Sequence, residues 1–285
     1  MSLFNKATCQ TEDILGFPVA TGTMEICLQQ IAGWLALREQ PRFFACANPH
    51  SLVVAMQDLL FRQALLSADL LIPDGTGIVI ASRMLGGVIC KRITGWDVFA
   101  GVSELLNRTS GRVFFLGAAE QTLAVIRTKM AQDYPNIQVV GTCSPPFRLK
   151  FSESENAAMV EAVNGARPDV LWVGMTAPKQ EKWIHQNLSL LDAGFVGAIG
   201  AVFDFYTGNI KRSHPVFQRA GLEWLARLVQ EPRRLWRRNL LSSPVFLGYV
   251  LRSIINKKMH TECSPRYQGY KCIKYPPPTS RNRNL

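Results

Sequence analysis

Three short segments of the chain place glycine beside side chains that could bind a ligand or accept a proton. They are residues 72–77 (IPDGTG), 94–97 (TGWD) and 177–183 (APKQEKW). Each begins where an apolar run ends and a helical pattern starts, which predicts a loop after a buried parallel strand. Ligands bind at such loops in open α/β sheets, because the loops meet at the carboxyl edge of the sheet. Asp74 is the acid of the first segment, and a carboxylate there could accept a proton.

Glycine and the helix starts add a second property to these segments. Glycine lets the backbone come close to a ligand, and a helix N-terminus offers N–H groups to a phosphate. A Pro-Asp-Gly sequence taken alone is equally typical of a turn with an N-cap. Three such segments in one chain favour a binding site.

Composition limits the class of protein. The chain has 285 residues, 47% of them hydrophobic and 19% charged, so it can bury a full α/β core. Its seven cysteines include no C-x-x-C pair and its four histidines lie far apart. These patterns indicate neither a disulfide framework nor a metal site, so we expect no metal, no cofactor and a cytoplasmic location. No secretion signal is predicted in residues 1–20, and no apolar run of about 18 residues predicts a membrane span.

The charge of the chain is concentrated towards its C-terminal end. Residues 1–200 contain 16 Lys and Arg against 17 Asp and Glu, whereas residues 201–285 contain 16 against 4. The last part therefore carries a net charge of +12, although the whole chain carries +11. A basic region of this kind suits an anionic partner such as phospholipid head groups, a diphosphate or nucleic acid.

Apolar runs and helical patterns alternate along most of the chain. After a strand or hairpin arm at 12–19, we expect strands at residues 43–47, 69–72, 112–116, 137–142, 169–173 and 195–199, and helices at residues 23–37, 49–66, 77–85, 97–106, 121–134, 154–164 and 178–188. This alternation predicts a Rossmann-like α/β fold, with a mostly parallel sheet and helices on both of its faces.

The pattern changes after Gly208, which suggests a division into domains. Residues 1–208 are expected to form the α/β domain, and residues 209–258 a basic helical appendage with breaks at Pro232 and Pro244. Residues 259–285 are polar and rich in proline, so we expect a disordered tail there.

The appendage combines arginine with tryptophan and leucine. Its basic cluster lies on about one and a half helical turns and consists of Arg233, Arg234, Arg237 and Arg238. Interleaved with it and just before it are the apolar residues Trp224, Leu225, Leu228, Leu235, Trp236, Leu240 and Leu241. This composition is typical of a helix that lies in a membrane interface, although a helix packed on the domain with solvated arginines would look similar. We expect no nucleic-acid partner, because no helix-turn-helix, RNP or zinc-finger pattern accompanies the charge.

Taken together, the motifs resemble those of the WecG/TagA/CpsF glycosyltransferases (glycosyltransferase family twenty-six). The resemblance covers residues 12–245 approximately, and the residues after about 258 match nothing in it. It rests on residues 14–19 (ILGFPV), 48–49 (NP), 73–78 (PDGTGI), 94–97 (TGWD), 116–118 (LGA), 177–183 (APKQEKW), 200–204 (GAVFD), 208–212 (GNIKR), 221–224 (GLEW), Arg227 and 230–234 (QEPRR). So many motifs in the same order make the resemblance specific.

The resemblance implies an inverting transfer of a sugar from a UDP-sugar donor to a saccharide linked to a polyprenyl diphosphate. Members act at the cytoplasmic face of the membrane in the synthesis of cell-wall polymers, capsules and exopolysaccharides. The protein would then be peripheral on an anionic membrane surface. The sugar, the acceptor saccharide and a homo-oligomeric state stay open, and glucose, N-acetylmannosamine and its uronic acid are all used by relatives.

The resemblance also implies roles for individual residues. Asp74 matches the proposed base, and Arg227 and Arg234 match arginines thought to meet the diphosphate, so these three are the expected catalytic residues. The expected substrate-binding residues are Asn48, Thr76, Thr94, Asp97, Gly117, Gln180 and Asp204. Among them, Asn48 and Gln180 match polar residues near the sugar and Asp204 an aspartate near the nucleotide. One departure is Cys46, which stands where members often have threonine.

Two other classes of protein compete with this interpretation. A nicotinamide- or flavin-dependent oxidoreductase could use the same sheet, but the strand at 112–116 leads into Gly117-Ala118-Ala119 instead of G-x-G-x-x-G. A basic adaptor without enzymatic activity would explain the charge. It would leave Asp74 beside Gly75, and the helix start at Lys179-Gln180-Glu181, without a purpose.

Overall fold

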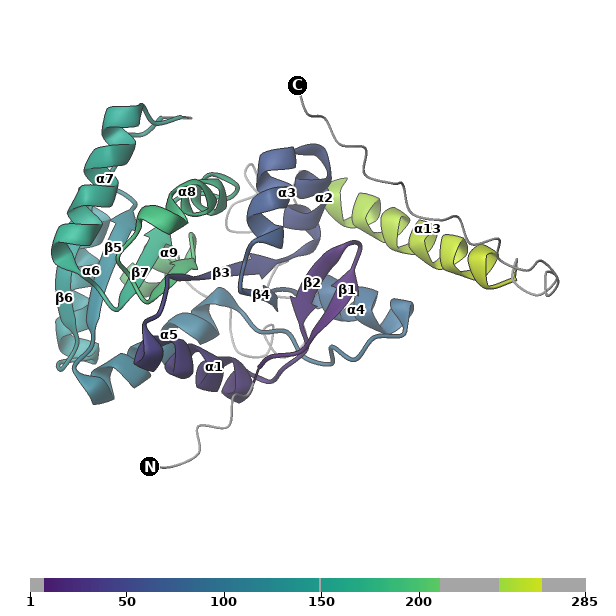
Figure 1. Cartoon of the computed structure of the whole chain (residues 1–285), viewed down its shortest axis with the longest axis horizontal. Helices are drawn as coiled ribbons and strands as arrows, with labels where there is room; N and C mark the ends of the chain where they lie inside the picture. Colours follow the sequence, from purple (N-terminus) through teal and green to yellow (C-terminus); the bar gives the residue numbers. More distant parts are fainter. Residues whose placement is uncertain (1–7, 149, 211–240, 263–285) are drawn as a thin grey trace, which may run out of the picture.

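Six parallel strands form the centre of the protein, and their ends set the place of the candidate site (Figure 1). The computed structural model describes residues 8–148, 150–210 and 241–262, with side chains up to residue 256. The strands are β3 (Arg42–Ala47), β4 (Leu70–Pro73), β5 (Arg112–Gly117), β6 (Gln138–Cys143), β7 (Val170–Gly174) and β8 (Phe195–Ala198), in the order β4-β3-β8-β7-β5-β6. The predicted Rossmann-like α/β fold with a parallel sheet is confirmed.

Helices cover both faces of this sheet, as the alternation predicted. One face packs against α1 (Met24–Leu37), α5 (Gly95–Thr109), α6 (Glu120–Asp133) and α9 (Val202–Thr207). The other packs against α2 (Pro49–Gln57), α3 (Leu59–Leu66), α4 (Thr76–Leu85), α7 (Glu153–Ala166), α8 (Lys179–Asn187) and α13 (Ser242–Glu262). In Figure 1, α1 and α5 lie below β3, whereas α2, α3 and α8 lie above it.

The strands contribute alternate residues to the two layers. In β3, Phe43 and Ala45 belong to the core beneath α2 and α8, whereas Phe44 belongs to the core beneath α1 and α5. In β7, Leu171 and Trp172 divide in the same way. Since successive side chains of a strand point to opposite faces, a strand that is apolar throughout is buried on both sides. This explains why the sequence shows continuous apolar runs here.

A small hairpin precedes the sheet. It consists of β1 (Thr11–Ile14) and β2 (Phe17–Ala20), which pair antiparallel and match the strand or hairpin arm predicted at 12–19. Ile14 and Phe17 are fully buried and join the core on the α2 face. The hairpin thus closes the core near β4.

The helix predicted at residues 49–66 is wrong as one element, because the chain forms two helices there. Asp58 interrupts it with extended backbone, and its side chain accepts a 3.1 Å hydrogen bond from Phe61 N at the start of α3. Aspartate competes for local backbone N–H groups, so it favours helix N-termini over helix interiors. Lys182 in α8 pairs with the same carboxylate and connects α3 to α8.

The loop predicted after a strand at residues 94–97 is also wrong in one respect. No strand precedes it; α4 is followed by an irregular segment that leads into α5. The segment still reaches the sheet, because Ile93 N donates a 3.0 Å hydrogen bond to Pro73 O at the end of β4. The buried residue Ile93 therefore gives the sequence an apolar pattern like that of a strand, although Ile93 lies in a loop that packs beside β4.

We expect the ion pair of Asp58 and Lys182 to make stability depend on pH. The hydrogen bond from Lys182 lowers the pKa of Asp58, so the folded protein binds a proton here less readily than the unfolded chain. Asp58→Asn retains an N-cap acceptor but removes the charge, and should lower the free energy of unfolding by about 0.5–1 kcal/mol at pH 7. The difference from wild type should be present at neutral pH and disappear as the pH falls through the folded-state pKa. Urea unfolding at steps from pH 7 to about pH 3 measures it.

Lys182→Met is the matched control for this ion pair. It removes the partner of Asp58 and should lower stability at pH 7 by a similar amount, with little further effect of Asp58→Asn in its background. A difference between wild type and Asp58→Asn that stays constant over the whole pH range would contradict the role of the charge.

Candidate functional site

The carboxyl ends of four neighbouring strands lie at one edge of the sheet. In the parallel register Ala47 of β3 lies opposite Pro73 of β4, and Val173 of β7 lies opposite Ala198 of β8. Because Phe44 of β3 lies opposite Gly197 of β8, β3 and β4 extend beyond the end of β8. The residue or loop after each of these strands therefore lies at the same edge. The helices that follow β3 and β8 cover opposite faces of the sheet. A ligand crevice opens at such a divergence in α/β sheets.

Asp74 follows β4 directly and is held against the start of α2. Its backbone N donates a 2.8 Å hydrogen bond to Ala47 O. A methyl group at Gly77 would lie 2.4 Å from Pro49 Cγ, and one at Gly75 would lie 3.9 Å from Asn48 Cβ. Only glycine at 77 permits this close packing. The structure thus brings Asp74 and Asn48 together from two different strands.

Asn48 is the N-cap residue of α2. Its Oδ1 accepts a 2.9 Å hydrogen bond from Ser51 N, and Ser51 Oγ accepts a 2.8 Å hydrogen bond from Asn48 N. The side chain oxygen is thus used by the helix, and the amide nitrogen Nδ2 is the group that could donate to a ligand. Asn48 is partly exposed, so the nitrogen can be reached.

Thr94 and Asp97 form the capping box of α5. Asp97 Oδ2 accepts hydrogen bonds from Thr94 N (2.9 Å) and Thr94 Oγ1 (2.8 Å), and Thr94 Oγ1 accepts one from Asp97 N (3.2 Å). These bonds give the pair a structural function at the helix start. A methyl group at Gly95 would lie 3.4 Å from Cys46 Sγ, so this helix start packs against β3. The contact of Thr94 and Asp97 with substrate stays a prediction.

Gln180 lies in the first turn of α8, which follows β7. Its side chain is 4% exposed, and its Nε2 donates a 2.9 Å hydrogen bond to Oε1 of Glu181, which is also 4% exposed. Gln180 Oε1 is buried and has no hydrogen-bond partner in the described part of the chain. A methyl group at Gly200, after β8, would lie 3.0 Å from this oxygen. The sequence motif at residues 177–183 contains Glu181, but Glu181 was not predicted as a site residue.

Three further predicted residues lie at or near the same edge. Thr76 is the first residue of α4, and Asp204 is in the first turn of α9 and partly exposed. Gly117 ends β5 with a φ of 111°, and a methyl group there would lie 2.6 Å from the backbone of Gly174. Close approach of two strands thus requires glycine at 117. The predicted catalytic residues Arg227 and Arg234 lie outside the described residues.

Lys179 positions a loop beside the site instead of projecting freely. Its Nζ donates a hydrogen bond to Arg148 O and lies 3.7 Å from the centre of the Phe151 ring. Burial lowers the pKa of Lys179, and the nearby carboxylate of Glu155 partly offsets this effect. The lysine therefore connects the start of α8 to the segment before α7.

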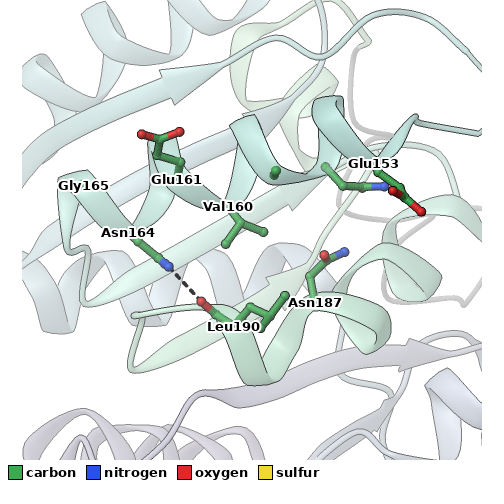
Figure 2. A pocket seen from close by; sticks show the side chains of 9 residues that line it. Glu153, Val160, Glu161, Asn164, Gly165, Asn187 and Leu190 are labelled. Atoms are coloured by element: carbon green, nitrogen blue, oxygen red, sulfur yellow. Dashed lines mark hydrogen bonds between the residues drawn. The ribbon is translucent and has the colours of Figure 1, made fainter.

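A groove between α7 and α8 is a separate feature (Figure 2). Its volume of about 790 Å³ is in the range of ligand pockets. The lining residues are Glu153, Asn156, Ala157, Val160, Glu161, Asn164, Gly165, Asn187 and Leu190, none of which is a predicted site residue. Asn164 is occupied in a 2.8 Å hydrogen bond to Leu190 O across the groove. The groove is therefore not the candidate site.

The described residues contain no group of three or more His, Cys, Asp or Glu side chains arranged to hold a metal ion. None of the described helices combines the length and the hydropathy needed to cross a membrane.

Comparison with known proteins relates the chain to one group of enzymes. The family model described as "Glycosyl transferase WecG/TagA/CpsF family" matches residues 12–260. An N-acetylglucosaminyldiphosphoundecaprenol N-acetyl-beta-D-mannosaminyltransferase of Bacillus spizizenii is 32% identical over 227 residues, which cover 80% of this chain and 83% of the relative. Proteins of the same name from Bacillus subtilis and Staphylococcus aureus are 28% and 25% identical. The matches cover 87% and 89% of this chain, and 94% and 97% of those proteins.

Gly117→Ala should lower the stability of the folded protein, whatever its effect on ligand binding. The positive φ and the contact with Gly174 should together lower the free energy of unfolding by about 2 kcal/mol or more. Gly33→Ala in α1 is the control, because a methyl group there meets no atom within 4 Å. That change should raise stability by up to about 1 kcal/mol. Thermal unfolding of both variants measures this, and an unchanged melting temperature of Gly117→Ala would contradict the packing argument.

Proposed function

We propose, because the chain belongs to the WecG/TagA/CpsF family of glycosyltransferases, that it transfers a hexose or N-acetylhexosamine-type sugar from a UDP-sugar to a polyprenyl-diphosphate-linked saccharide. The observation that supports the proposal is that Asp74, Asn48 and Gln180 follow the carboxyl ends of three parallel strands, β4, β3 and β7, at the same edge of the sheet. The names of the relatives support N-acetylmannosamine as the first sugar to test and diphosphate-linked N-acetylglucosamine as the first acceptor. Such a reaction belongs to the synthesis of exopolysaccharide, capsule or cell-wall polymers.

Asp74 acts as the general base in this proposal. A bond forms between the acceptor hydroxyl oxygen and the anomeric carbon, while the bond from that carbon to the UDP oxygen breaks. The hydroxyl proton passes to the Asp74 carboxylate, and UDP leaves with the bonding electron pair. Attack from the side opposite to UDP inverts the anomeric configuration. A carboxylate positioned at the hydroxyl accelerates this step by removing the developing positive charge from the oxygen.

Polar groups of the site suit the other parts of the donor. Asn48 Nδ2 can donate a hydrogen bond to the sugar, and Asp204 is proposed to contact the nucleotide. Arg227 and Arg234 are proposed to neutralise the negative charge that develops on the departing UDP, as arginine can without a metal ion. The alternative of an oxidoreductase is not favoured, because β5 leads into Gly117-Ala118-Ala119, which lacks a dinucleotide-binding fingerprint.

Asp74→Asn tests the proposed function. The substitution keeps the size of the side chain but removes the proton acceptor, so turnover should fall by a factor on the order of 10² to 10⁴ while UDP still binds. UDP-N-acetylmannosamine, UDP-N-acetylglucosamine and UDP-glucose are each supplied with polyprenyl-diphosphate N-acetylglucosamine, and radioactive product is extracted into organic solvent. UDP binding is measured by calorimetry.

Asp192→Asn is the matched control for this experiment. Asp192 is a surface residue before β8, at the amino end of that strand, where it pairs with Arg38. Its variant should retain full turnover. Turnover of Asp74→Asn within a few-fold of wild type would remove Asp74 as the base, and no product from any donor would refute the transferase proposal.

Peripheral attachment to the inner face of the cell membrane is the second part of the proposal. The inward face of α13 carries Phe246 and Val250, which are 4% and 0% exposed and pack in the core with α2 and α4. Its outward face carries apolar side chains that are 43% to 57% exposed: Val245, Leu247, Leu251 and Ile255. An apolar outer face in a basic region suits the interface of an anionic bilayer.

The buried side of α13 determines how this can be tested. Truncation after residue 208 would expose the core that Phe246 and Val250 cover, so it would change folding as well as membrane binding. The double change Leu247→Ser and Leu251→Ser alters only the outer face. It should weaken binding to phosphatidylglycerol vesicles by about tenfold or more, because two leucine side chains no longer enter the bilayer. Sedimentation with vesicles measures the effect.

Leu37→Ser with Leu190→Ser is the control, since these leucines are 61% and 60% exposed on other elements. It should bind vesicles as the wild type does. Equal binding by the α13 double variant and the wild type would show that this face does not enter the membrane.

A further inference from the structure

The orientation of the Gln180 amide is fixed by the residue beside it. Gln180 Nε2 donates its hydrogen bond to Glu181 Oε1 within a buried pair. A carboxylate only accepts hydrogen bonds, so the NH₂ group of Gln180 has to face it. Because the amide is planar, its carbonyl oxygen Oε1 then points away from Glu181.

The Gln180 carbonyl oxygen faces the carboxyl end of β8. It lies 3.0 Å from where a Cβ of residue 200 would be, and Gly200 has none, so no side chain from this position covers the oxygen. Within the described ranges no donor reaches it, although it is buried. A buried carbonyl that has lost water without gaining a donor is destabilising, which indicates a ligand group that donates to it.

We propose that Glu181 is a positioning residue, which holds the Gln180 amide so that its carbonyl oxygen accepts a hydrogen bond from an O–H or N–H group of the donor sugar. This inference rests on the proposed function. It specifies that the sugar presents a hydrogen-bond donor at this point, such as a hydroxyl group or the N–H of an acetamido group. A donor sugar that lacks the group there would leave the carbonyl without a partner.

Exchange of the two side chains separates this role from a merely structural one. In Glu181→Gln the new amide can donate as well as accept, so the Gln180 amide can turn and present NH₂ to the sugar. In the double variant Gln180→Glu with Glu181→Gln, one carboxylate oxygen of residue 180 accepts from residue 181. The other oxygen of residue 180 is then again an acceptor for the sugar.

The wild type is first assayed with UDP-N-acetylmannosamine, UDP-N-acetylglucosamine and UDP-glucose to find the donor that it uses. The experiment then measures kcat and KM for that donor. The Kd of UDP is measured by calorimetry. Glu181→Gln should lower kcat/KM about tenfold or more, while the Kd of UDP stays within about twofold. The double variant should recover kcat/KM to within about threefold of wild type. Matched controls are Glu161→Gln in α7 and Gln186→Glu in α8, both exposed, which should change neither quantity.

Gln180→Met provides a second route if Glu181→Gln does not fold. It removes the carbonyl and should lower kcat/KM by a similar factor with the UDP affinity unchanged. The proposal is overturned if Gln180→Met or a folded Glu181→Gln keeps wild-type kcat/KM, if the double variant does not recover, or if UDP affinity falls by the same factor as kcat/KM. A wild type that neither binds UDP nor uses any UDP-sugar refutes instead the proposed function.

Discussion

The parallel direction of the strands is the constraint on which the candidate site depends, because it brings their carboxyl ends to one edge of the sheet. Asp74 follows β4, Asn48 follows β3, and Gln180 and Gly200 follow β7 and β8. Hydrogen bonding in register aligns the ends, so side chains far apart in the chain are held at one edge before any ligand arrives.

Close backbone packing turns this alignment into a defined geometry. Gly77 allows the Asp74 loop to lie on Pro49, and Gly117 allows β5 to approach β7 at Gly174. Gly174 in turn leaves space for the ring of Phe203 in α9. Each glycine removes a methyl group that would separate two elements, so the glycines near the site serve packing as much as access for a ligand.

Helix α13 connects the C-terminal region to the same site. Ser242 at its start hydrogen-bonds His50 Nδ1 at 2.8 Å, and His50 lies two residues after Asn48 in α2. Helix α13, which is proposed to enter the membrane, therefore contacts α2, the helix that Asn48 caps. Helix α13 extends to Glu262, past the predicted start of the tail at residue 259.

Local burial leaves a periodic pattern of apolar residues, and this pattern predicted the parallel sheet, the helices on both faces and the segments around Asp74 and Gln180. It did not determine the break at Asp58 or the path of residues 86–94, where a polar cap and a packed loop resemble other patterns. That the Gln180 carbonyl faces Gly200 follows only from the tertiary fold. This proximity depends on the pairing of β7 with β8, and the periodicity of a chain records how buried a strand is but not which strand lies beside it.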